Sequence, residues 1–165
     1  MTSQSINVRP TRSHEDEYLK KWLLEPEVLQ WFPMVDEREV DDAVRYWMTF
    51  ATTGACFTAE WNGMPCGMAN LYISGYKKLS HQCLFSIIVS EMYRSKGIGK
   101  ALIEQLEKVA REKFQIEVLH LEVYDGNPAI HLYQRMGFTE YGRQRRFIKE
   151  DRRYIDKILM QKRLT

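Results

Sequence analysis

Residues 87–101 read IIVSEMYRSKGIGKA, and this stretch decides which fold the chain can take. It begins inside a continuous apolar run, residues 84–89, whose length and composition predict a strand buried on both faces. A turn containing Gly97 and Gly99 follows, and apolar residues then recur at helical spacing from residue 99 to residue 114. The sequence therefore predicts a buried strand, a glycine-rich turn and a long helix in direct succession.

This turn has the features of an anion-binding site. Glycines allow backbone N–H groups to approach an anion without obstruction by a Cβ atom, and the start of a helix adds free N–H donors and partial positive charge. Arg94, Lys96 and Lys100 add full charges. A Walker A loop is excluded because Ala101 follows Gly99-Lys100, and a dinucleotide-binding GxGxxG is excluded because its third glycine is Leu102. The pattern that remains is R-x-x-G-x-G.

A second informative stretch, residues 121–138, reads LEVYDGNPAIHLYQRMGF. Residues 118–123 alternate in the manner of a strand, and residues 128–136 have the pattern of a helix that Gly137 ends. Pro128 suits the first turn of that helix. Asn127 stands at its start, where its side chain can cap the helix, bind a ligand, or do both.

Together, R-x-x-G-x-G and N-P-A-x-x-L-Y-x-x-x-G-F resemble the two signature motifs of the GNAT superfamily of acetyl-CoA-dependent N-acetyltransferases. The resemblance implies an α+β fold, in which a central, mostly antiparallel twisted sheet of six to seven strands is flanked by about four helices. It also implies one N-acetyltransferase domain over residues 1–165, with acetyl-CoA as co-substrate and no metal. The acetyl-CoA-binding residues that it predicts are Ile87, Ile88, Val89, Arg94, Ser95, Lys96, Gly97, Ile98, Gly99, Lys100 and Asn127.

The resemblance also assigns catalytic roles. Tyr133 matches the tyrosine that serves the family as general acid, although an aromatic core residue would fit the same position. Glu122 is the candidate general base, with a water relay or a structural ion pair as alternatives. Trp31 and Phe32 belong to a segment, residues 22–32, similar to segments of aminoglycoside and ribosomal-protein acetyltransferases, and they are the candidate acceptor-binding residues.

The chemistry of acyl transfer gives these groups a purpose. An alkyl ammonium group has a pKa of ~10.4, so removing its proton at pH 7 costs about 4–5 kcal/mol of free energy. A general base or a water relay therefore assists the attack. The leaving thiolate needs a proton. Neither motif contains a cysteine, which favours direct attack by the amine in a ternary complex over a covalent acetyl-enzyme. A non-catalytic acyl-CoA-binding module is the alternative function.

The remaining segments complete a mixed αβ domain. Asn62-Gly63 is a strong hairpin signal between two strand-like runs. The other predicted elements are strands at 6–10, 55–61, 66–73, from 138 onward and 154–160, helices at 14–24 and 36–50, and a short helical turn at 27–31. The order β, helices, ββ, β, α, β, α, ββ requires at least one βαβ crossover.

Composition narrows the function classes. Among 165 residues, 44% are hydrophobic and 28% are charged, which is ordinary for a globular domain. No apolar run approaches the ~18 residues that a membrane helix needs, and residues 1–5 show no secretory signal. The three cysteines lack metal-ligand spacing, and His120 and His131 have no partner at such spacing. We therefore expect a cytoplasmic protein without a metal site, existing as a monomer or homodimer.

Charge is unevenly distributed although the net charge is only +2. Residues 15–42 hold ten acids and three bases, and residues 142–153 hold six bases and two acids. Because the acidic segment belongs to the acceptor side in the resembled family, we predict a cationic small-molecule or peptide acceptor: a polyamine, an aminoglycoside-like amine, or a lysine or N-terminal amine of a protein. Solvated helix faces are the alternative. The acidic N-terminal half argues against nucleic-acid binding by the basic segment.

Overall fold

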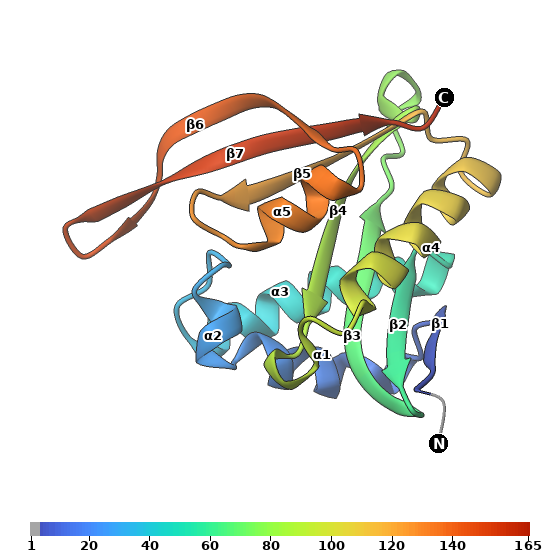
Figure 1. The fold of residues 1–165 in the computed structure, drawn as a ribbon, viewed down its shortest axis with the longest axis horizontal. Helices are drawn as coiled ribbons and strands as arrows, with labels where there is room; N and C mark the ends of the chain where they lie inside the picture. Colours follow the sequence, from blue (N-terminus) through green and yellow to red (C-terminus); the bar gives the residue numbers. More distant parts are fainter. Residues whose placement is uncertain (1–3) are drawn as a thin grey trace.

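The computed structural model describes residues 4–165. Residues 1–5 were said to show no secretory signal, and the first three of these lie outside the described residues. Its elements, shown in Figure 1, are β1 (Ile6–Pro10), α1 (Asp16–Leu23), α2 (Pro26–Leu29), α3 (Glu37–Thr49), β2 (Cys56–Trp61), β3 (Met64–Tyr72), β4 (Gln82–Val89), α4 (Ile98–Glu112), β5 (Val118–Tyr124), α5 (Ala129–Arg135), β6 (Thr139–Glu150) and β7 (Arg153–Arg163). Short 3₁₀ helices occupy Ser13–Glu15, Phe50–Thr53, Lys77–Leu79 and Glu91–Tyr93.

Local sequence explains several of these boundaries. Asn62 and Gly63 both have positive φ, 49° and 84°, which is the geometry that a two-residue hairpin between β2 and β3 requires. Helix α3 begins where the Asp36 side chain accepts a hydrogen bond from the Glu39 N–H at 2.9 Å. These features confirm the predicted hairpin and the second predicted helix.

The seven strands form one sheet in the order β1-β2-β3-β4-β5-β7-β6. Every neighbouring pair is antiparallel except β4 and β5, which are parallel and connected through α4. This arrangement confirms the predicted α+β class, the mostly antiparallel sheet and the βαβ crossover, and the sheet carries five α-helices among the described residues. The β6–β7 hairpin extends well beyond the body of the molecule (Figure 1).

Two apolar clusters cover the two faces of the sheet. On one face, buried residues of α4 and Tyr133 of α5 pack with Phe85, Leu121 and Phe138. On the other, residues of α1, α2 and α3 pack with Cys56, Met68 and Ile88. Adjacent residues of a strand point to opposite faces, so β4 contributes Phe85 to the first cluster and Ile88 to the second. The sheet therefore separates two compartments that can communicate only where neighbouring strands part.

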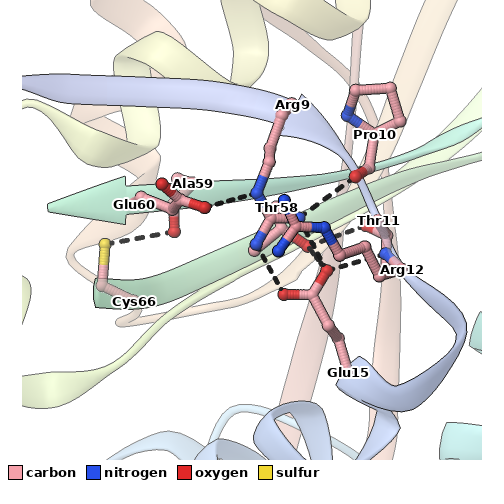
Figure 2. Close-up of polar contacts among 9 residues, drawn as sticks. All are labelled: Arg9, Pro10, Thr11, Arg12, Glu15, Thr58, Ala59, Glu60 and Cys66. Carbon is pink, nitrogen blue, oxygen red and sulfur yellow. Dashed lines mark hydrogen bonds and ion pairs between the residues drawn. The ribbon is translucent and has the colours of Figure 1, made fainter. Parts of the chain in front are cut away.

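A buried polar network attaches β1 to the start of the helical layer (Figure 2). Arg9 donates two hydrogen bonds of 2.8 Å to the carboxylate of Glu15, whose side chain is only 1% exposed, and it also pairs with Glu60 of β2. The Arg12 N–H donates to Glu15 at 2.7 Å, and Thr58 adds a longer bond. One acid of the predicted acidic segment is therefore part of the core.

Sheet geometry corrects one expectation about β4. The run 84–89 was predicted to be buried on both faces, but Ser86, Ile87 and Val89 are only partly buried. Pairing between β4 and β5 stops after three residues, with Gln82, Cys83 and Leu84 opposite Val118, Leu119 and His120. Beyond Leu84 the two strands diverge, as Figure 1 shows, so the second half of β4 has no partner strand on the β5 side. Within residues 4–165, no helix is both long and apolar enough to cross a membrane.

Candidate active site

A cleft of about 720 Å³ lies beside the diverging strands β4 and β5. Its walls come from the glycine-rich turn, β4, the end of β5, α5, the α2–α3 region and the β6–β7 hairpin. Segments from both sequence motifs therefore meet in one cavity. The cleft reaches both faces of the sheet, because it is lined by Tyr133 on the α4–α5 side and by Trp47 on the α1–α3 side.

The glycine-rich turn presents a row of free backbone donors. Within residues 4–165, none of the N–H groups of residues 95–100 has a hydrogen-bond partner, and the first intrahelical bond of α4 runs from Ala101 to Gly97. Ser95 and Gly97 have positive φ, 61° and 85°, which turns the chain sharply before the helix. A helix start with unsatisfied N–H groups is a ready-made site for a phosphate group.

The charged residues of the turn do not all face the cleft. Lys100 lines it, as do Ser95, Ile98 and both glycines. Arg94 also lines it while donating to the carbonyl of Glu27 at 3.1 Å, which joins the turn to α2. Lys96 instead lies over the ring of Trp61, 5.4 Å from its centroid, and does not line the cleft. Lys96, which was predicted to bind acetyl-CoA, is therefore not among the residues that line the cleft.

Gly99 has a packing role in addition to its place in the turn. A Cβ atom there would lie 2.9 Å from Cδ2 of Leu132, so the missing side chain allows α4 to approach α5 closely. This contact brings the start of α4 and the helix carrying Tyr133 to the same end of the cleft. The glycine spacing therefore serves both the turn and the helix contact.

Strand β4 offers backbone groups to the cleft. The Ser90 N–H donates to the carbonyl of Cys66, and alternate residues of an antiparallel strand bond to the same neighbour. Ile88, opposite Met68, therefore bonds toward β3, whereas the N–H and C=O groups of Ile87 and Val89 point toward the side that β5 has left. Of these three predicted residues, Ile87 and Val89 provide backbone groups and Ile88 provides apolar side-chain surface.

Tyr133 is 7% exposed and packs between Phe85 and Phe138, with ring centroids 6.4 and 6.3 Å away. Burial raises the pKa of its hydroxyl well above the ordinary value of 10, so the group is protonated at neutral pH. Tyr133 also lines the cleft. It is therefore a core residue in the cleft wall, and its role as proton donor stays a prediction.

Glu122 and Asn127 border the same cleft. The carboxylate of Glu122 is 43% exposed and lies 3.2 Å from Nζ of Lys157 in β7. The Asn127 side chain accepts a hydrogen bond of 3.0 Å from the Ala129 N–H, so it caps α5 while lining the cleft. Of its two predicted roles, the capping role is therefore present in the structure.

Aromatic side chains form the wall on the α1–α3 side. Trp31 and Phe32, predicted as acceptor-binding residues, both line the cleft. Tyr46 stacks on Tyr72 with centroids 5.5 Å apart, and the Tyr72 hydroxyl lies 2.9 Å from Ser86 Oγ. Sequence patterns did not identify the further wall residues Tyr46, Tyr72, Tyr124, Phe147 and Lys157. Tyr72, Tyr124, Phe147 and Lys157 alternate with core residues along strands, and Tyr46 lies on α3. Neither pattern distinguishes a cleft wall from a core.

The acidic segment is not part of this wall. None of its ten acids lines the cleft: Glu15 is in the buried network, Glu25 accepts hydrogen bonds from Ser90, and Glu37 and Asp41 pair with Lys20. The acid that does line the cleft is Glu122, and it is paired with Lys157. The prediction of a cationic acceptor depended on an acidic wall formed by residues 15–42, and these acids do not line the cleft.

The cysteines also lie away from the cleft. Cys56, Cys66 and Cys83 are buried free thiols, and burial raises the pKa of each, to about 11, 11 and 12 respectively. None of them lines the cleft. Within residues 4–165, no group of three or more His, Cys, Asp or Glu side chains is arranged to hold a metal ion.

Known proteins share this sequence pattern and fold. An N-alpha-acetyltransferase of Sulfurisphaera tokodaii is 46% identical over 56 residues, 33% of this chain and 34% of its own length. The L-amino acid N-acetyltransferase AaaT of Escherichia coli is 23% identical over 100 residues, 60% of this chain and 62% of its own. The chain thus matches between about a third and three fifths of these relatives' lengths.

Agreement in fold extends over nearly the whole chain. The structure of yncA from Salmonella typhimurium, assigned as an acetyltransferase and solved with its cofactor acetyl-CoA, has a TM-score of 0.81 at 20% identity and covers 97% of this chain and 94% of its own. Residues 17–138, which include both motifs, match the profile of the acetyltransferase (GNAT) family. The chain therefore belongs to the GNAT family of acetyltransferases.

Proposed function

We propose that this protein is an acetyl-CoA-dependent N-acetyltransferase whose single domain spans the chain. The observation that carries the proposal is that the N–H groups of residues 95–100, which have no partner among the described residues, and Tyr133 belong to the wall of one cleft. The family membership and the acetyl-CoA bound in the structurally similar yncA support the same reading.

In this proposal, the pyrophosphate of acetyl-CoA binds the N–H groups at the start of α4, with Lys100 and Arg94 beside them. The pantetheine follows the unpaired edge of β4, where Ile87 and Val89 provide N–H and C=O groups. Asn127 also lines the cleft. The thioester then lies near Tyr133, where the two halves of the cleft meet.

Transfer is proposed as direct attack in a ternary complex. The acceptor ammonium loses a proton to Glu122, directly or through water, and its nitrogen attacks the thioester carbon. The C–N bond forms, the C–S bond breaks, and Tyr133 protonates the departing thiolate. The second proton released by the nitrogen returns to the tyrosinate through solvent, so one proton is released overall for each amide formed.

The acceptor itself remains a separate question. A cationic acceptor, whether a polyamine, an aminoglycoside-like amine or a protein amine, was predicted from an acidic wall, and the acids concerned lie outside the cleft. The names of the relatives refer to different acceptors, L-amino acids for one of them. Cytoplasmic location and a monomeric or homodimeric state stay predictions.

The direct test is a paired assay. Acetyl-CoA should raise the melting temperature of the protein, because a ligand that binds only the folded state stabilises it by mass action. A panel of primary amines should then release CoA in amounts equal to the N-acetylated product. Stabilisation by acetyl-CoA without CoA release from any amine would favour the non-catalytic acyl-CoA-binding module.

A further inference from the structure

The acceptor side of the cleft contains a polar group that no residue of the fold satisfies. The hydroxyl of Tyr124 is fully buried and has no hydrogen-bond partner among the described residues, although Tyr124 lines the cleft. Tyr124 is 6% exposed overall. A buried hydroxyl without a partner carries a desolvation cost, so its presence points to a partner that a bound molecule supplies.

Lys157 is the direct cross-strand neighbour of Tyr124 and also lines the cleft. It is 8% exposed, its ammonium lies over the ring of Phe147 at 3.9 Å, and Glu122 is its carboxylate partner at 3.2 Å. An ammonium group has three donors, and one carboxylate oxygen at this distance leaves others available. Tyr124 and Lys157 are cross-strand neighbours, Lys157 pairs with Glu122, and all three residues line the cleft, so two donor residues and one carboxylate belong to one part of its wall.

The groups of these three residues are complementary in charge to a zwitterion, which carries a carboxylate and an ammonium group. A carboxylate needs two donors, which the Tyr124 hydroxyl and the Lys157 ammonium can provide. A neighbouring ammonium needs an acceptor, which Glu122 provides. Resting on the proposed function, we infer that the acceptor is a free amino acid, whose amine is held at Glu122 and whose carboxylate is held by Lys157 and Tyr124.

The surroundings indicate which amino acids fit. The wall beside the three residues is aromatic, with Trp31, Phe32, Tyr46 and Phe147, and it offers apolar area rather than charge. An apolar side chain gains free energy by burial there, whereas a second ammonium group would be brought close to Lys157. Apolar amino acids are therefore preferred to polyamines, and an amino-acid amide offers the Lys157 ammonium no carboxylate beyond that of Glu122.

The experiment compares each of leucine, methionine and phenylalanine with its own amide, and with spermidine, in the CoA-release assay. Wild-type protein should show kcat/KM for the acids roughly tenfold or more above that for the amides, since a hydrogen bond to a charged group is lost in each amide. The difference should lie mainly in KM. Amides or spermidine as the better acceptors would overturn the inference.

Substitutions separate recognition from folding. Lys157→Met keeps the length of the side chain and should lower kcat/KM for the acids at least ~10-fold more than kcat/KM for the amides. Both classes of acceptor share the loss of the ion pair with Glu122, and the acids alone lose the carboxylate contact. Tyr124→Phe should act in the same direction. Lys149→Met, on the same hairpin but outside the cleft lining, is the matched control and should change neither.

Each other outcome is decisive. Equal losses for acids and amides in Lys157→Met would make Lys157 a structural residue and overturn the inference while leaving the proposed function intact. Absence of CoA release from every amine in wild-type protein would contradict the proposed function, and the inference that rests on it would be overturned too.

Discussion

At the scale of single residues, Tyr133 belongs both to the core and to the cleft wall. Its ring fills the core beside Phe85 and Phe138, and the residue also lines the cleft. The sequence motif assigned this tyrosine the role of general acid, and that role stays a prediction. The motif could not predict that burial would raise the hydroxyl pKa, because that depends on which rings pack around it.

Tyr133→Phe tests the role of the hydroxyl. The change removes one oxygen and keeps the ring, so packing and acetyl-CoA affinity should change little, while kcat falls by about 10²-fold if the hydroxyl protonates the thiolate. Single-turnover CoA release and the acetyl-CoA-induced melting shift measure the two quantities. Tyr141→Phe, at an exposed position outside the cleft lining, is the control. A kcat for Tyr133→Phe within about threefold of wild type would leave Tyr133 as a core residue alone.

Glu15 shows how a residue can depart from the pattern of its neighbours. It belongs to an acidic segment that was predicted to act as a charged wall, yet it is buried beneath Arg9. Burial alone would raise the pKa of Glu15, but the hydrogen bonds from Arg9 and the Arg12 N–H outweigh it and the pKa is lowered. Nothing in the local sequence distinguishes this acid from Asp16 or Glu17, because its partners come from β1 and β2.

Glu15→Gln should therefore destabilise the fold by about 3 kcal/mol, because Arg9 loses a buried partner. The lowered pKa means that the contribution of Glu15 is fully present above its unfolded value near 4.5 and is lost as pH falls through the folded value. Denaturant unfolding of both proteins from pH 7 to pH 3 should show the difference narrowing in acid. Glu37→Gln, which breaks a surface pair with Lys20, should cost under ~1 kcal/mol. Equal effects of the two substitutions would contradict the buried role.

At the scale of elements, sequence periodicity identified the strands, the helices and the Asn62-Gly63 hairpin because each depends on neighbouring residues. The order of the strands and the divergence of β4 from β5 depend on contacts distant in sequence. For that reason the run 84–89 was interpreted as fully buried, and the cleft at its end was not foreseen. The turn after β4 was predicted from its glycines, and the structure adds that Lys96 turns away toward Trp61.

Lys100→Glu tests the turn as an anion site. Replacing a positive charge by a negative one beside the free N–H groups should raise the acetyl-CoA KM roughly tenfold, with the effect shrinking as salt rises. The same change at Lys108, exposed farther along α4, provides the control and should leave KM unchanged. Equal KM values for the two variants would argue against acetyl-CoA phosphates at the start of α4.

At the scale of the whole molecule, the cleft beside the diverging strands β4 and β5 connects the compartments on the two faces of the sheet. The α4–α5 side presents backbone donors and Tyr133, and the α1–α3 side presents an aromatic wall with Lys157 and Glu122. The predicted acetyl-CoA-binding residues other than Lys96 line the cleft, and the motifs could name them together because they lie in short stretches of sequence. Their binding roles stay predictions. The compartment on the α1–α3 side is assembled from segments that are distant in sequence, and its chemistry could not be predicted from any one of them.

We propose that this cleft transfers an acetyl group from acetyl-CoA to an amine. CoA release with mass-spectrometric identification of the product tests this, using free apolar amino acids, their amides and polyamines as acceptors. We predict CoA release that depends on both substrates, together with an equal amount of product carrying the acetyl group on nitrogen. CoA release that does not depend on an amine, or acetyl-CoA binding without any transfer, would contradict the claim.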